Sequence, residues 1–128
     1  MRRIGTRTAN AALYGNRLIS HLSDLAGGRR KVSQHLTYSE MMKDTGATGI
    51  PIGVGRDLEY LLEALETAGL PLGLTLFVTP KKGVLGELLD LEGFAKRAIR
   101  KETLLRFRKE TLDYDWDNIV FEQENALG

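Results

Sequence analysis

The strongest constraint on the fold is one amphipathic stripe near the middle of the chain. Five apolar residues recur at the spacing that gathers side chains on one face of an α-helix, namely Leu58, Leu61, Leu62, Leu65 and Ala68. Gly69 follows the last of them, and glycine commonly ends helices. The pattern predicts a helix that buries this face and carries three acids on its exposed face, Glu59, Glu63 and Glu66.

Two further helices are predicted before it. Apolar residues between Thr8 and Ala26 also recur at helical spacing, and two glycines end that pattern. Thr37 and Glu40 have the spacing of a capping box, which predicts the start of a short helix. Residues 46–55 are too rich in glycine for regular structure, so they predict an extended turn.

The residues after the central helix predict a β-hairpin. Residues 72–79 are rich in β-branched and aromatic types, residues 80–83 are turn formers, and residues 84–85 provide a short returning strand. Apolar residues between 88 and 107 predict a helical extension, and the apolar tail at 114–121 is expected to pack onto the core. We therefore predict an α+β fold, a winged helix-turn-helix with its core at about 36–87, an N-terminal helix and a helical C-terminal extension.

Length and composition narrow the class of protein. A chain of 128 residues forms one contiguous core, so we predict a single domain over 1–128. The chain has no cysteine, which excludes thiol chemistry and fits a reducing compartment, and no apolar run approaches a membrane span. We expect a cytoplasmic protein with no membrane partner. The first 23 residues contain four arginines and no acid, and we expect them to form an ordinary N-terminal helix.

The residues with catalytic or metal-binding chemistry are poorly placed for it. His21 and His35 are the only histidines and lie far apart in sequence, so we expect surface histidines and no metal site. Ser20, His21 and Asp24 include the residue types of a catalytic triad, but neighbours on one helix cannot take up its geometry. We expect a non-enzymatic chain with no cofactor.

The net charge of +1 conceals a segregated charge pattern. Residues 1–56 carry nine basic and three acidic groups, and residues 57–95 carry two and seven. Residues 96–110 carry seven basic and two acidic groups, and residues 111–128 carry none and five. This segregation suits either a polyanionic partner at the basic parts or pairing between blocks inside the fold.

Several basic residues lie where a winged helix contacts nucleic acid. Arg56 is at the start of the third predicted helix and Lys81 and Lys82 are at the wing tip, positions that meet phosphates in such folds. A basic loop extends the same surface, with Arg29, Arg30 and Lys31. This placement predicts binding to double-stranded nucleic acid or to a nucleoprotein complex. The acids of the third helix would repel phosphates in a deep groove, so the alternative is that they bind a protein partner.

Several short segments resemble the winged-helix domain of the alkylguanine-DNA alkyltransferase and alkyltransferase-like family. They are Thr37-Tyr38-Ser39-Glu40-Met41-Met42, Val54-Gly55, Pro71 and residues 78–86. The resemblance covers about residues 36–87 and implies that Tyr38 contacts the phosphate of a flipped nucleotide. Ile52 stands where that family has the arginine that fills the base stack, and Thr75 stands near the place of its reactive cysteine. The resemblance therefore implies a DNA-binding module that does not transfer alkyl groups.

A second resemblance extends over most of the chain. Four segments resemble a group of small bacterial and phage proteins, namely residues 69–75, Phe77-Val78, residues 83–86 and Tyr114-Asp115-Trp116. This likeness implies a phage or mobile-element origin. The alternative function is therefore inhibition of a host defence complex, as an anti-CRISPR factor does, with Glu59, Glu63 and Glu66 as the contact face.

Overall fold

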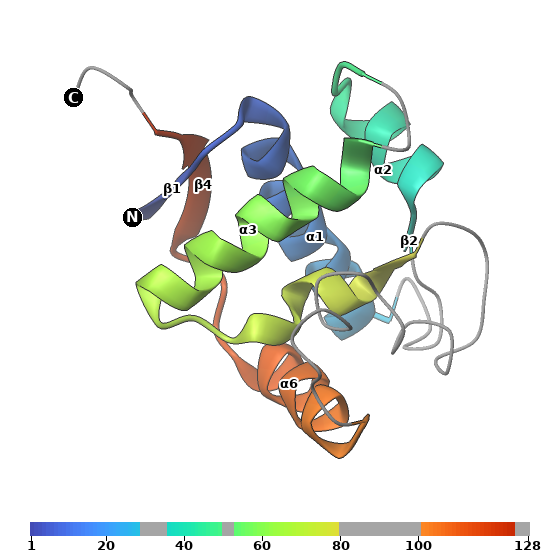
Figure 1. Cartoon of the computed structure of the whole chain (residues 1–128). Coiled ribbons are helices and arrows are strands. Elements are labelled where there is room, and N and C mark those ends of the chain that lie inside the picture. The colour runs from blue at the N-terminus through green and yellow to red at the C-terminus, as the bar shows by residue number, and fades with distance from the viewer. Residues whose placement is uncertain (29–35, 50–52, 80–100, 125–128) are drawn as a thin grey trace.

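The computed structural model describes residues 1–28, 36–49, 53–79 and 101–124 (Figure 1). These residues form a mixed α+β structure that is mostly helical, as the sequence predicts. Along the chain they form β1 (Arg2–Thr6), α1 (Ala9–Ala26), β2 (Leu36–Thr37), α2 (Tyr38–Thr45), α3 (Val54–Ala68), the 3-10 helix η2 (Leu72–Phe77), β3 (Val78–Thr79), α6 (Lys101–Asp113) and β4 (Ile119–Gln123).

The strands form two parallel pairs that join distant parts of the chain. β1 pairs with β4, with Arg2 opposite Ile119 and Thr6 opposite Gln123. β2 pairs with β3, with Leu36 opposite Val78. α1 packs against α2, α3, η2 and the β1–β4 pair, so it lies at the centre of the described structure. One hydrophobic cluster includes Ile4 near one end of the chain and Phe121 near the other.

The predicted helices α1, α2 and α3 are confirmed together with their end signals. The Thr8 hydroxyl caps α1 by accepting a hydrogen bond from the Ala11 amide. The Thr37 hydroxyl accepts from the Glu40 amide and donates to the Glu40 carboxylate, which confirms the capping box. Gly69 ends α3 with a φ of 70°, a left-handed conformation that glycine adopts without strain. α3 begins at Val54, inside the stretch predicted as turn.

The prediction that residues 72–79 form the first strand of a hairpin is wrong for residues 72–77. Residues 72–77 form the 3-10 helix η2, and β3 pairs with β2 in parallel. Every residue from Gly73 to Phe77 is buried, whereas a strand with one covered face would alternate. The reason is that α1, α3 and α6 pack around this segment on several sides. The predicted turn and returning strand lie outside the described residues.

Two other findings differ from the sequence analysis. Arg2–Thr6 form strand β1, which the sequence did not predict, whereas the helix predicted from about Thr8 begins as expected at Ala9. His21 was expected at the surface, but its side chain is fully buried and its ring centroid lies 6.3 Å from that of Phe77. His21 belongs to the buried face of α1, with Leu18, Leu22 and Leu25. His35 lies outside the described residues.

The apolar tail packs onto the core as predicted. Ile119 and Phe121 of β4 are buried, and the Trp116 indole donates a 2.9 Å hydrogen bond to the carbonyl of Thr111 at the end of α6. None of the helices in the described ranges is long and apolar enough to cross a membrane.

Candidate binding groove

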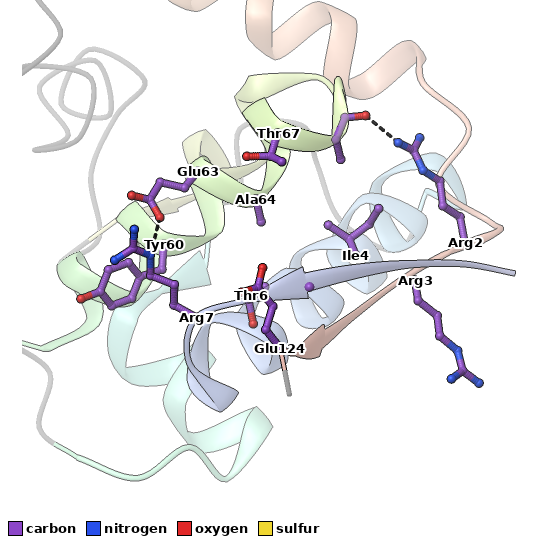
Figure 2. Close-up of a pocket in the computed structure, with 12 residues that line it drawn as sticks. Arg2, Arg3, Ile4, Thr6, Arg7, Tyr60, Glu63, Ala64, Thr67 and Glu124 are labelled. Carbon is purple, nitrogen blue, oxygen red and sulfur yellow. Dashed lines mark hydrogen bonds and ion pairs between the residues drawn. The ribbon is translucent and has the colours of Figure 1, made fainter. Parts of the chain in front are cut away.

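A groove of about 450 Å³ lies between β1 and α3 (Figure 2). One wall is β1 and its continuation, residues 2–7, and the other is one face of α3. The α3 residues follow the i, i+3, i+4, i+7 spacing of a single face, with Tyr60, Glu63, Ala64 and Thr67. Ile4, Thr6 and Ala64 are almost fully buried and form the floor, and most of the other side chains that line the groove are polar or charged.

The outer edge of β1 borders this groove with unused backbone groups. The Arg2 amide donates to the Asn118 carbonyl, and the Glu124 amide donates to the Thr6 carbonyl. In a parallel pair, alternate residues direct both backbone groups to the same neighbour, so Arg2, Ile4 and Thr6 bond to β4. The N–H and C=O groups of Arg3 and Gly5 therefore point away from β4.

The outer edge of β4 is treated differently. The Phe121 amide donates a 2.8 Å hydrogen bond to Oδ1 of Asn16, and the Phe121 carbonyl accepts a 2.9 Å bond from Nδ2 of the same side chain. One amide side chain on α1 thus satisfies both backbone groups that β4 directs outward at its centre. No described residue does the same for Arg3 and Gly5 on the β1 side.

Gly5 is the point at which the backbone itself lines the groove. It has no side chain, yet it is one of the lining residues, so its main-chain atoms form part of the surface. A Cβ atom added there would lie 2.5 Å from the Glu124 side chain, which lies over Gly5. Figure 2 shows the Arg3 side chain extending from the side of β1 that faces away from α3. The Arg3 guanidinium makes no ion pair with any described residue.

An arginine lies near each end of the groove, and each already has a partner. Arg7 forms a 2.9 Å ion pair with Glu63, and its guanidinium lies 5.4 Å from the centre of the Tyr60 ring. At the other end, Arg2 donates a 2.6 Å hydrogen bond to the carbonyl of Ala68 in the last turn of α3. A cation is favourable there because the carbonyl end of a helix is electronegative. Both contacts hold β1 beside α3.

A buried acid in the first turn of α3 joins that helix to the start of α1. Asp57 is 8% exposed and accepts a 2.8 Å hydrogen bond from the Thr8 hydroxyl that caps α1. Burial raises the pKa of the neighbouring Tyr14 hydroxyl above its usual value, and the charge of Asp57 adds to that effect. The Tyr14 hydroxyl is fully buried and has no hydrogen-bond partner among the described residues.

Across the described residues, no cluster of three or more histidines and acids is arranged to hold a metal ion.

The predicted site residues are only partly brought together. Of the three acids predicted to bind a protein partner, Glu63 lines the groove, whereas Glu59 and Glu66 lie on α3 outside its lining. Arg56 is exposed in the first turn of α3, and Tyr38 is half-buried against the core at the start of α2. The remaining predicted phosphate contacts lie outside the described residues, namely Arg29, Arg30, Lys31, Lys81 and Lys82.

Sequence reasoning missed the β1 wall of the groove. Ile4 and Thr6 are buried while Arg3 is exposed, an alternation typical of a strand with one covered face. In the sequence, the trace of this alternation is Ile4 and Thr6, two β-branched residues two positions apart in an arginine-rich stretch, and this pattern is too short to identify a strand.

Comparison of the chain with protein-family models, with curated proteins and with solved structures finds no match.

Proposed function

We propose that the chain is a cytoplasmic, non-enzymatic binding module that engages a protein partner through the face formed by β1 and α3. The observation that carries the proposal is the groove itself, which joins Glu63, an acid of the predicted contact face, to an open strand edge. Its charged ends are engaged in the Arg7–Glu63 and Arg2–Ala68 contacts, an arrangement that suits a preformed docking surface better than acid–base chemistry.

The charge of α3 supports a protein partner over a polyanion at this face. One side of the helix carries three acids, Glu59, Glu63 and Glu66. Such a surface repels phosphates and favours groups that tolerate or complement negative charge.

The test is selection from a phage-displayed library of random ten-residue peptides. The wild-type chain is compared with a variant that reverses the charge of the α3 face, Glu59→Lys, Glu63→Lys and Glu66→Lys. A control variant makes the same charge change at exposed positions elsewhere, Glu110→Lys, Asp113→Lys and Asp117→Lys. We expect the selected peptides to bind wild type and control but to lose at least tenfold in affinity for the α3 variant. Equal binding to all three chains, or no selected peptide, would refute the proposal.

A second candidate function is binding of double-stranded nucleic acid through the basic residues that the sequence predicts as phosphate contacts, Arg56, Lys81 and Lys82 among them. Arg56 is exposed at the start of α3, and the parts of the chain outside the described ranges contain eight basic and three acidic residues. Fluorescence anisotropy with labelled duplex DNA over a salt series tests this candidate. It requires affinity that falls steeply with salt, and less steeply after Lys81→Ala with Lys82→Ala. Absence of binding at low salt would exclude it.

A further inference from the structure

We infer that the partner contributes an extended peptide segment, which adds to the outer edge of β1 as a third strand and places an acidic side chain beside Arg3. This inference rests on the proposed function and specifies the ligand of the same groove.

The backbone geometry of β1 supports strand addition. Arg3 and Gly5 direct their N–H and C=O groups away from β4, and no described residue bonds to them there. An exposed strand edge of this kind is a template for a further strand, and several peptide-recognition domains use such an edge. The Asn16 side chain blocks the corresponding groups of β4, so β1 is the open edge of this sheet.

The shape of the groove fits one extended chain. Side chains of an added strand alternate between the two faces of the sheet. Those on the α3 side meet Ile4, Ala64 and Thr67, of which the first two are nearly buried and apolar, and Ala64 leaves little side-chain bulk in the wall. Small residues therefore suit the inward positions beside Ala64, and a basic or hydroxyl-bearing residue suits the position beside Glu63.

The charge on the other face specifies the outward positions. Arg2 and Arg7 are engaged by Ala68 and Glu63, whereas Arg3 extends on the side away from α3 and pairs with no described acid. Opposite charges on adjacent strands attract each other, and a like charge is disfavoured. The ligand side chain beside Arg3 is therefore acidic, while Glu124, which lies over Gly5, disfavours an acid at the next outward position.

A backbone test separates strand addition from other ways of filling the groove. The peptides selected above are synthesised with a single N-methyl group at each position in turn. Because only alternate residues of the added strand bond to β1, N-methylation must weaken binding at least tenfold at positions of one parity and leave the other parity nearly unchanged. On the protein side, the amides of Arg3 and Gly5 become protected from hydrogen exchange when the peptide is bound.

Matched variants of Gly5 give the same test from the other partner. Gly5→Pro removes the outward N–H and leaves the hydrogen bonds to β4, whereas Gly5→Ala adds a Cβ against Glu124 and keeps that N–H. We expect at least tenfold weaker binding of the peptide to the proline variant than to the alanine variant, with both chains folded. Should the proline variant not fold, the N-methyl series decides alone.

Arg3→Gln tests the acidic position and retains the backbone. We expect several-fold weaker binding of acidic peptides and a loss of their salt dependence, with little effect on the same peptides carrying Gln in place of the acid. N-methylation without a parity pattern, or unchanged exchange of the Arg3 and Gly5 amides, overturns strand addition. If the same peptides still lose affinity for the α3 variant, the proposed function stands and only this inference fails.

Discussion

Replacing Asn16 with alanine is expected to destabilise the fold far more than its position on the middle of a helix suggests. The Asn16 side chain makes two hydrogen bonds, of 2.8 and 2.9 Å, to the amide and carbonyl of Phe121, which is 105 residues away in sequence. Phe121 is 2% exposed, so water does not readily replace the lost partner. Removing one partner of a buried bond costs about 1–3 kcal/mol. Two such losses, partly relieved by local opening, correspond to about 2–4 kcal/mol.

The assay is equilibrium denaturation by urea, monitored by circular dichroism, with Asn10→Ala as the matched control. Asn10 lies on the same helix and makes a single 2.7 Å bond to the Thr48 carbonyl at an exposed site, so its loss is expected to cost less than about 1 kcal/mol. Hydrogen exchange provides a local measurement, because the Phe121 amide should exchange faster in the Asn16 variant. A loss of less than about 0.5 kcal/mol in the free energy of unfolding for Asn16→Ala would show that the two hydrogen bonds of this side chain do not stabilise β4.

Asn16→Asp sharpens the same argument through pH. A carboxylate still accepts from the Phe121 amide but cannot donate to its carbonyl, so about half of the stabilisation is lost at neutral pH. The protonated carboxyl group can donate, so the folded state raises its pKa relative to the unfolded chain. The deficit against wild type should therefore shrink as pH falls toward about 4, the ordinary pKa of an aspartate in the unfolded chain. A deficit that does not depend on pH would contradict a donor role for this side chain.

Three further outcomes are expected. Tyr14→Phe removes a buried hydroxyl that has no hydrogen-bond partner among the described residues, so thermal denaturation should show unchanged stability or a gain of about 1 kcal/mol. Burial and the charge of Asp57 raise the Tyr14 pKa in the folded state, so the unfolded chain loses the hydroxyl proton at a lower pH than the folded chain does. The stability of the fold should therefore decrease as pH rises above about 10, and it should decrease less in Tyr14→Phe. Gly73→Ala should lower the free energy of unfolding by about 1–3 kcal/mol in urea denaturation, because an added Cβ meets the Phe107 backbone and the Thr111 hydroxyl. Gly28→Ala is the control, since an added Cβ there meets no atom within 4 Å and the variant loses only the ease with which glycine adopts its φ of 74°.

The helices were predictable because their information is local. The leucine stripe of α3, the Thr37–Glu40 capping box and Gly69 are separated by a few residues and act through contacts within one or two turns. The burial of Trp116, Ile119 and Phe121 was predictable for a simpler reason, since large apolar side chains seldom remain exposed.

The misassigned elements depend on partners that are distant in sequence. Residues 72–77 have the composition of a strand, but the helices around them bury the whole segment and leave no alternating surface. His21 occupies a buried position of α1, and its residue type gave no indication of the Phe77 ring beside it. β1 is defined by pairing with residues 119–123, so its five residues contain little local information.

The groove was the least predictable feature because its principal groups belong to the main chain. The outward N–H and C=O of Arg3 and Gly5 are present in almost any residue, and only the register with β4 determines the direction in which they point. The same register directs the Phe121 backbone toward Asn16, which is why one edge of the sheet is closed and the other is open. A one-residue shift of that pairing would reverse the direction of the β1 groups and turn Ile4 away from the core. The packing that buries Ile4 and Thr6 therefore also fixes the open backbone edge beside α3, so the site follows from the core and not from a motif.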